Sequence, residues 1–274
     1  MNQEFTVLKE CLQTAGKIAK RHLGKVGFDL KAKANLVTKA DVACQKAILK
    51  IIQKNFPQHD FLAEEDGLKN SGSAYKWIID PIDGTTNFAH GMPHFSVSVA
   101  LAYKNDIILG GVYDVCMDEM FLARKGKGAT LNGKKIRVSS VKKLENALLV
   151  TGFPYVRENR MEELLNRFEN FILSCHDIRR LGSAALDMCW VAAGRFDGYW
   201  EDCLNPWDIA AGKLILEEAG GKVTDYSGKK WTKPETFGRQ TLASNGKIHR
   251  EMFDIIKKGS CGGRNGVPPM KERV

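Results

Sequence analysis

The segment from Trp77 to Phe88 reads W-I-I-D-P-I-D-G-T-T-N-F and carries two carboxylates close together. Asp80 comes where an apolar strand is expected to end, and the proline after it cannot donate to a strand ladder, so Asp80 and Asp83 should project from one strand-to-loop corner. Two carboxylates at one corner repel each other, and a divalent cation with oxygen ligands, including the Ile82 carbonyl, would relieve that repulsion. The alternative is a solvated Asp-Gly turn, and this motif alone does not decide between the two.

The residues after Asp83 favour phosphate as a ligand. Gly84 frees the backbone, and Thr85 and Thr86 offer hydroxyl and N–H groups where a helix is expected to start. Backbone N–H groups at a helix start bind phosphate well. The combined pattern predicts a divalent metal beside a phosphate group.

Two further acidic segments could contribute to the same site. Phe61 to Gly67 places three acids after a short apolar run, and Glu64 is the best candidate there for another metal ligand. Glu201 to Asp208 is the third acidic segment. Each also has an ordinary explanation, because charge runs usually face water and an acid in the first turn of a helix, as Asp208 would be, favours that helix without any chemistry.

Asp41 has a structural explanation of its own. It is the third residue after Thr38, and this spacing is typical of a capping box that opens a helix. A catalytic role for Asp41 therefore needs other evidence.

Common nucleophilic and zinc motifs are absent from the sequence. There is no G-x-S-x-G, no Walker-type phosphate loop and no H-E-x-x-H, and the six histidines show no ligand spacing. The seven cysteines lack a C-x-x-C pair and are odd in number, which favours reduced thiols over a disulfide framework or a zinc site.

Hydrophobic periodicity predicts the elements that must position these residues. In the first half we expect two amphipathic helices, over 5–19 and from Thr38 to before Pro57, and then a mostly antiparallel sheet. Its expected strands are 77–79, 95–101, 107–113 and 120–123, with a hairpin turn at Asn132-Gly133. In the second half helices and strands should alternate: strand 147–150, helix 161–172, a helix capped by Ser183 and ending at Gly194, helix 208–219, strands at 223 and 242–243, and helix 248–256.

Length and composition are those of a globular protein. The chain has 274 residues, 43% hydrophobic and 27% charged, which excludes disorder as the main state, and it has no apolar run long enough to span a bilayer. We expect a cytoplasmic protein without a membrane partner, with an N-terminal half over 1–140, a C-terminal half over 141–258 and a loose tail over 259–274. The halves should join near Ser139 to Glu145. The net charge of +9 favours anionic partners.

Taken together, these segments resemble the inositol monophosphatase family. The first family motif matches residues 77–88, the second matches Trp207 to Gly212 (W-D-I-A-A-G), and Phe61 to Gly67 and Arg180 to Ala185 match two further elements, so that the resemblance runs from about Thr38 to Gly221. It implies an α/β (α+β) fold, a layered αβαβα sandwich of the sugar-phosphatase type. It also implies a Mg²⁺-dependent phosphomonoester hydrolase.

The resemblance assigns roles to individual positions. The implied metal ligands are Glu64, Asp80, the carbonyl of Ile82, Asp83 and Asp208. Thr85 would lie near the attacking water, with Glu64 or Asp41 orienting that water and accepting its proton. Substrate would be contacted by Gly84, Thr85, Gly182, Ser183, Ala184 and Glu201.

The same resemblance also implies candidate substrates and partners. Thr86-Asn87-Phe88 resembles the branch of inositol monophosphatases and archaeal-type fructose bisphosphatases, so myo-inositol monophosphate is the first candidate substrate and fructose bisphosphate the second. Nucleotide and histidinol phosphates rank behind. The resemblance also implies a homodimer and inhibition by Li⁺. RNA or a transcription complex is an alternative partner, for which the basic pairs Arg179-Arg180, Lys229-Lys230 and Lys257-Lys258 are candidates, although no aromatic residues interleave with them.

Overall fold

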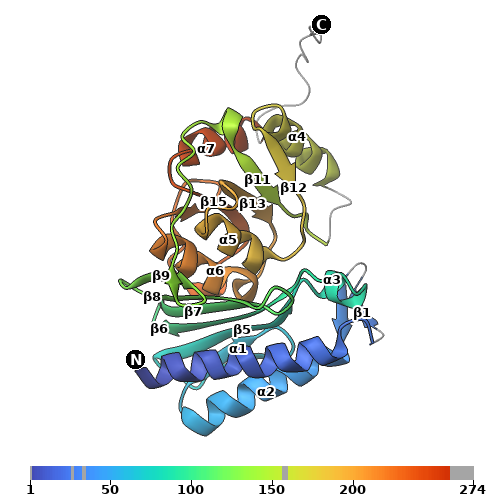
Figure 1. Cartoon of the computed structure of the whole chain (residues 1–274), viewed down its shortest axis with the longest axis vertical. Helices are drawn as coiled ribbons and strands as arrows, with labels where there is room; N and C mark the ends of the chain where they lie inside the picture. Colours follow the sequence, from blue (N-terminus) through green and yellow to red (C-terminus); the bar gives the residue numbers. More distant parts are fainter. Residues whose placement is uncertain (1, 26–27, 33–34, 156–159, 260–274) are drawn as a thin grey trace, which may run out of the picture.

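Helices and sheets alternate in five layers along the long axis of the molecule (Figure 1). The computed structural model describes residues 2–25, 28–32, 35–155 and 160–259. From one end to the other, the layers are a helix pair, an eight-stranded sheet, a second helix pair, a five-stranded sheet and a third helix pair. This arrangement confirms the predicted αβαβα sandwich.

The outer helix pair at the N-terminal end consists of α1 (Asn2–His22) and α2 (Lys39–Asn55). Both are amphipathic as predicted, and α1 buries Leu8, Leu12 and Ala15 against the large sheet. Thr38 opens α2 through the predicted capping box. A separate two-stranded hairpin, β1 (Phe28–Ala32) with β2 (Asn35–Thr38), precedes α2.

The large sheet is antiparallel except for one pair of strands. Its order is β10-β9-β8-β7-β6-β5-β3-β4, and β3 and β5 are the parallel neighbours. The predicted mostly antiparallel sheet and the Asn132-Gly133 hairpin are both confirmed. The strands are β3 (Asp60–Ala63), β4 (Gly67–Lys69), β5 (Tyr75–Asp83), β6 (Ser96–Tyr103), β7 (Asp106–Asp114), β8 (Glu119–Arg124), β9 (Gly128–Leu131) and β10 (Lys134–Lys135).

The central helices α5 (Ala184–Ala192) and α6 (Pro206–Glu218) lie between the two sheets. Helix α6 is apolar around nearly its whole circumference, as expected for a helix covered on both sides. It approaches the large sheet closely at Gly110 of β7, where an added Cβ would lie 2.9 Å from the carbonyl oxygen of Ala211. The short helix α3 (Thr85–Ala89) follows β5 directly.

The smaller sheet has the order β12-β11-β13-β15-β14 and mixes parallel and antiparallel pairs. Its strands are β11 (Leu148–Thr151), β12 (Asp177–Arg179), β13 (Gly198–Asp202), β14 (Lys222–Thr224) and β15 (Gln240–Ser244). Helices α4 (Met161–Ile172) and α7 (His249–Gly259) cover its outer face. The 3₁₀ turns are Leu144–Asn146 and Pro234–Thr236.

The predicted alternation of helices and strands in the second half is confirmed, with two strands that the sequence did not indicate, β12 and β13. Gly259, where the loose tail was predicted to start, is the last residue of α7, and the remainder of that predicted tail lies outside the described residues. Across the ranges that the structure describes, no helix has the length and apolar character needed to cross a membrane.

Candidate active site

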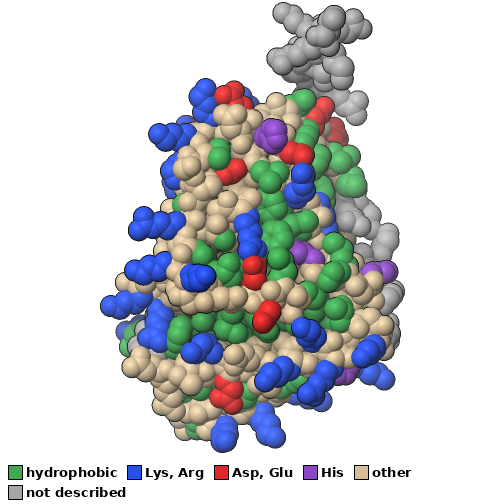
Figure 2. All heavy atoms as spheres, in the orientation of Figure 1, with side chains coloured by type: hydrophobic (Ala, Val, Ile, Leu, Met, Phe, Trp, Pro, Cys, Tyr) green, Lys and Arg blue, Asp and Glu red, His purple; other side chains and the backbone are tan. Residues whose placement is uncertain are grey.

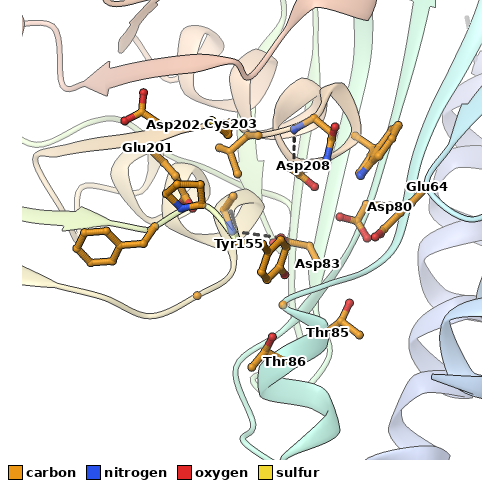
Figure 3. Close-up of a pocket in the computed structure, with 18 of the residues that line it drawn as sticks. Glu64, Asp80, Asp83, Thr85, Thr86, Tyr155, Glu201, Asp202, Cys203 and Asp208 are labelled. Carbon is orange, nitrogen blue, oxygen red and sulfur yellow. Dashed lines mark hydrogen bonds between the residues drawn. The ribbon is translucent and has the colours of Figure 1, made fainter. Parts of the chain in front are cut away.

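A pocket opens where the ends of β3, β5 and β13 meet the starts of α3, α5 and α6 (Figure 3). Residues from both sheets contribute to its walls, so segments far apart in the sequence face one another across it. Its lining residues are Glu64, Asp80, Ile82, Asp83, Gly84, Thr85, Thr86, Phe153, Pro154, Tyr155, Arg180, Gly182, Ala184, Glu201, Asp202, Cys203, Leu204, Asn205, Trp207 and Asp208.

Three carboxylates converge at the centre of the pocket. Asp80, Asp83 and Asp208 each offer an oxygen, and these oxygens all lie within 4.8 Å of one another. Burial raises the pKa of all three carboxyl groups, to about 6 for Asp83. Repulsion from the neighbouring acids raises the pKa of Asp80 and Asp208 further. Such a cluster is costly when fully ionised unless a cation lies within it.

Glu64 joins this cluster through the parallel pairing of β3 with β5. Ala63 is paired with Ile79, so the residue after β3 lies beside Asp80, and the Glu64 amide donates to the Ile79 carbonyl at 3.3 Å. The charge of Glu64 raises the pKa of both Asp80 and Asp208. Figure 3 shows the Glu64 and Asp80 side chains pointing toward the same space.

Asp208 belongs both to the cluster and to the start of α6. It is the third residue of the helix, and its Oδ2 accepts from the Asn205 amide at 2.7 Å in a capping box. The capping interpretation of this acid and its interpretation as a possible metal ligand therefore hold together. The helix begins two residues earlier than predicted, because Asn205 caps it and Pro206 occupies the first turn.

Asp41 likewise has contacts both at a helix start and toward the pocket region. Its Oδ2 accepts from the Thr38 amide at 2.8 Å and from the Thr38 hydroxyl at 2.6 Å, which completes the predicted capping box. Its Oδ1 lies 3.3 Å from Thr85 Oγ1. Burial raises the pKa of Asp41, and the charge of Glu65 raises it further. Asp41 does not line the pocket. It contacts Thr85, which does.

Asp83 joins the large sheet to α5. Its carboxylate accepts from the Ser183 hydroxyl and from the amides of Ala184 at 3.2 Å and Ala185 at 2.9 Å. Ser183 was expected to cap α5 with its own side chain, and that expectation is wrong: it occupies the cap position, but its hydroxyl donates to Asp83. The carboxylate of Asp83 satisfies the first amides of the helix instead.

Gly84, Thr85 and Thr86, the residues predicted to lie near phosphate, form part of the pocket wall. Gly84 has φ +92°, and a Cβ there would lie 3.1 Å from the Gly182 carbonyl oxygen, so both the conformation and the space require glycine. Thr85 Oγ1 lies 2.9 Å from the Ile82 carbonyl oxygen. The Thr85 hydroxyl has one proton, so it can donate a hydrogen bond either to the Ile82 carbonyl or to Asp41 Oδ1, but not to both at once.

Glu201 lines the pocket together with Gly182 and Ala184. It is the fourth residue of β13, and its Oε2 accepts from the Tyr199 hydroxyl at 2.6 Å. Burial raises the pKa of Glu201 to about 7. A Cβ on Gly152 would overlap the Glu201 carboxylate, at 2.0 Å from Oε2, so glycine at 152 determines where this carboxylate can lie.

The structure thus brings all but two of the predicted site residues to the pocket wall. Asp41 lies behind Thr85, and Ser183, buried against Asp83, does not line the pocket. Sequence reasoning missed the loop Phe153 to Tyr155 and the guanidinium of Arg180, which do line it. The glycine and proline around Phe153 are turn residues and were the available signal.

The donor set suits a hard divalent cation. All the converging groups are oxygens: carboxylates from three or four residues and the backbone carbonyl of Ile82. No histidine or cysteine belongs to the cluster found among the described residues, so the soft or nitrogen ligands favoured by zinc and copper are missing from it. Beside the cluster, Gly84 and Thr85 offer a place for an anion. The arrangement can bind a phosphate group against a metal.

Comparison with known proteins agrees with this chemistry. The model of the inositol monophosphatase family matches residues 1–258. The Nus factor SuhB of Pasteurella multocida is 46% identical over 200 residues, covering 73% of this chain and 75% of that protein. The inositol-1-monophosphatase of Rhizobium meliloti is 41% identical over 258 residues, which cover 93% of this chain and 96% of that protein. The solved structure of an inositol monophosphatase from Anabaena (Nostoc) sp. superposes with a TM-score of 0.84 at 39% sequence identity. The match covers 94% of this chain and 97% of that chain. The chain is a member of the inositol monophosphatase family and a phosphatase.

Proposed function

We propose that this protein is a Mg²⁺-dependent phosphomonoesterase that hydrolyses myo-inositol monophosphate to inositol and phosphate. The observation that carries the proposal is the buried carboxylate cluster of Asp80, Asp83 and Asp208 directly beside the Gly84-Thr85 corner. The relative from Rhizobium meliloti, named inositol-1-monophosphatase, supports the choice of substrate.

The ligands proposed for Mg²⁺ are the side chains of Glu64, Asp80, Asp83 and Asp208 and the carbonyl of Ile82. When bound there, Mg²⁺ would neutralise charge on the phosphate oxygens, lower the pKa of a bound water and stabilise the departing alkoxide. The raised pKa values of Asp80 and Asp208 agree with this assignment: burial and then repulsion between the acids raise them, and a bound cation offsets both effects.

The protein groups would orient the reactants and take up the proton. Thr85 Oγ1 lies between the Ile82 carbonyl and Asp41 Oδ1, so this hydroxyl can accept a hydrogen bond from a water while donating to either oxygen. Asp41, buried and with a raised pKa, or Glu64 would accept the proton that the water loses. Gly84 lets the backbone approach the phosphate closely.

The alcohol part of the substrate would lie on the side of Gly182, Ala184 and Glu201. Glu201 Oε2 is already held by the Tyr199 hydroxyl, so the carboxylate is fixed in position to accept hydrogen bonds from ring hydroxyls. Ser183 acts only indirectly in this proposal, by fixing Asp83.

Phosphate release by the purified protein tests the proposal. We would assay myo-inositol 1-phosphate, fructose bisphosphate, 3′-phosphoadenosine phosphate and histidinol phosphate in parallel, with and without Mg²⁺. We expect Mg²⁺-dependent release that is fastest from myo-inositol 1-phosphate. Asp83→Asn should lower kcat by more than about 100-fold at saturating Mg²⁺, and Glu65→Gln should not. Near-normal turnover by Asp83→Asn would refute the metal assignment.

A second candidate function is binding to RNA or to a transcription complex. The relative named Nus factor SuhB and the net charge of +9 support it. On the face in Figure 2, Lys and Arg side chains lie mainly along the left and lower margins, with others further in among apolar and acidic side chains, and Arg179 is paired with Asp177. Binding to an RNA backbone should weaken steeply as salt rises, whereas turnover should depend first on Mg²⁺. An RNA affinity unchanged by salt would refute backbone binding.

Three further properties belong to the same proposal. We infer a homodimer, which sedimentation as a monomer would contradict, and inhibition by Li⁺ in competition with Mg²⁺, which full activity at tens of millimolar Li⁺, on the order of what weak cation sites require, would contradict. We also infer a cytoplasmic location. The cysteines of the described residues are free thiols, as in a reducing compartment.

A further inference from the structure

One cationic side chain lines the pocket within the described ranges, and the reaction proposed above does not use it. Six acidic residues line the pocket, and Arg180 is the single Lys or Arg among them. Arg180 follows β12 directly and precedes the turn into α5. The pocket therefore carries a positive charge on the side where the alcohol of a substrate would lie.

The guanidinium of Arg180 folds back over the turn. A Cβ built on Gly182 would lie 2.5 Å from Arg180 Nη1, so the side chain rests directly on the Gly182 backbone. Gly182 has φ +89°, and only glycine offers both that conformation and that space. The positive charge of Arg180 also acts on Glu201 and on buried Asp187, lowering the pKa of each against the effect of burial. Arg180 thus shares one wall with Glu201.

No hydrogen bond or ion pair to another described residue holds this guanidinium. Its neighbour Arg179 is paired with Asp177, and Glu201 is held by Tyr199. A guanidinium has a planar set of donors that matches two phosphate oxygens at once. The donors of Arg180 are therefore available to a ligand in the pocket.

We propose that Arg180 binds a second anionic group on the alcohol part of a sugar substrate, so that a sugar bisphosphate is favoured over the matching sugar monophosphate. This inference rests on the proposed phosphatase function and specifies its substrate class. The other charges on that wall, Glu201 and Asp202, are negative. Without Arg180 they would repel a second phosphate, so its removal should reverse the preference as well as weaken it.

Fructose 1,6-bisphosphate and fructose 1-phosphate form the test pair, because they differ only in the second phosphate. We would measure kcat/KM for C1 phosphate release with Mg²⁺ in the unmodified protein, Arg180→Ala, Arg180→Lys and the control Arg179→Ala. The unmodified protein should prefer the bisphosphate. Arg180→Ala should lower the bisphosphate-to-monophosphate ratio by about tenfold or more, mainly through KM, which corresponds to ~1.4 kcal/mol. Arg180→Lys should keep part of the preference, and Arg179→Ala all of it.

Two outcomes overturn the inference. If Arg180→Ala slows both substrates equally, Arg180 serves only to offset the charges of Glu201 and Asp187. If the unmodified protein prefers the monophosphate, no second anion is bound. If myo-inositol 1-phosphate and both fructose phosphates all release no phosphate, the proposed function is refuted instead. Whenever the fructose phosphates are not hydrolysed, calorimetric binding of the two sugars with Mg²⁺ tests Arg180: bisphosphate binding must weaken in Arg180→Ala and stay unchanged in Arg179→Ala.

Discussion

Two carboxylates in this protein, Asp41 and Asp208, each contribute both to a helix start and to the pocket region. Asp41 caps α2 through Oδ2 and meets Thr85 through Oδ1, and Asp208 caps α6 through Oδ2 while its carboxylate belongs to the acidic cluster. A cap fixes the rotamer of its side chain, so the second oxygen is positioned without further contacts. The stability of these helices and the geometry of the site are consequently linked.

Asp80→Asn should stabilise the protein when no metal is bound. The pKa of Asp80 is raised in the fold, so its effect on stability is favourable at low pH and is lost as pH rises, because the unfolded chain ionises this group more easily. At pH 7.5 the substitution should therefore raise the free energy of unfolding of the metal-free protein. Thermal unfolding in EDTA measures this effect.

Mg²⁺ should stabilise the unmodified protein more than the Asp80→Asn variant. It should raise the Tm of the unmodified protein and have little effect on Asp80→Asn, since binding to the folded state alone is stabilising. Asp66→Asn removes the same charge from an exposed loop position and should behave like the unmodified protein. A metal-free Asp80→Asn protein less stable than the parent would contradict the repulsion argument.

Thr85→Val should separate catalysis from folding. The hydroxyl is buried beside Ile82 and Asp41, and valine fills nearly the same volume without a polar atom to orient water. We expect kcat to fall by about 10²–10⁴-fold, the usual range for a positioned proton-transfer group. Steady-state kinetics at saturating Mg²⁺ would show this, and Thr85→Ser should restore most of the rate. Equal activity in Thr85→Val would mean that the hydroxyl has no role in the reaction.

At the scale of elements, a buried ion pair ties α4 to the end of β13. Arg167 and Asp202 are each 2% exposed and form a salt bridge, and Glu163 on α4 adds a second contact to Arg167 at 2.6 Å. This pair holds the strand that carries Glu201. Removing the charge of Asp202 would take away the buried partner of Arg167 and leave it paired with Glu163, whose side chain is partly exposed.

Asp202→Asn should therefore lower the free energy of unfolding by about 3–5 kcal/mol. Urea denaturation measures the change. Glu163→Gln alters the 38% exposed member of the network and should cost less than about 1 kcal/mol. The double change Arg167→Met with Asp202→Leu should recover much of the loss. If Asp202→Asn were as stable as Glu163→Gln, the pair would not hold β13 in place.

Elements with one polar and one apolar face could be predicted from the sequence. Elements covered on both sides were predicted less accurately. Helix α1 shows a clear periodicity because only one face is buried. Helix α6 is buried nearly all around, so periodicity gave its extent only approximately. Strand β13 is buried at every position and carries charged Glu201 and Asp202, which obscured its strand character. The parallel pairing of β3 with β5, which places Glu64, is a long-range contact that local sequence does not encode.

Most of the pocket was predictable for a different reason. Its acids stand in short motifs in which turn residues, capping residues and carboxylates coincide, and those motifs also carry the family resemblance. The motifs did not reveal how individual side chains are oriented. Nothing in the order of residues showed that Ser183 donates to Asp83 or that Arg180 folds over Gly182. These directions depend on packing between separate sheets.

At the scale of the whole molecule, pH should act on stability through a histidine far from the pocket. His249 of α7 is 4% exposed, and its ring lies 3.1 Å from Thr224 Oγ1 and 2.9 Å from Ser244 Oγ. Burial lowers its pKa to about 4 from 6.5. The folded state thus binds fewer protons than the unfolded chain between these values. Stability should be full above pH 6.5 and fall by about 3 kcal/mol as pH drops toward 4.

His249→Gln should remove this part of the pH dependence while keeping a polar group at the site. Denaturation midpoints between pH 4 and 7 in excess Mg²⁺ measure it, because the metal limits the opposing contribution of the acidic cluster. His22→Gln on α1 is the matched control for replacing a histidine by glutamine. A profile for His249→Gln with the parent's slope would show that other groups cause the acid sensitivity.

The pocket exists only once both sheets and the helices between them have packed. Asp80 and Asp83 end a strand of the large sheet, Glu201 belongs to the smaller sheet, and Asp208 starts a helix that contacts Gly110 of β7 closely. A bound cation would therefore join parts of the chain that are far apart in sequence, as well as supporting the reaction.

The shared duty of Asp41 and Asp208 also has an evolutionary consequence. Each is needed to begin a helix, so natural selection for folding alone would keep both acids in a descendant that no longer hydrolysed phosphate. Thr85 has no cap to maintain, and Arg180 has no bond to another described residue, so these positions would be free to drift first. Retention of acids in a distant relative would then record ancestry, and the state of the threonine would be the better guide to whether catalysis survives.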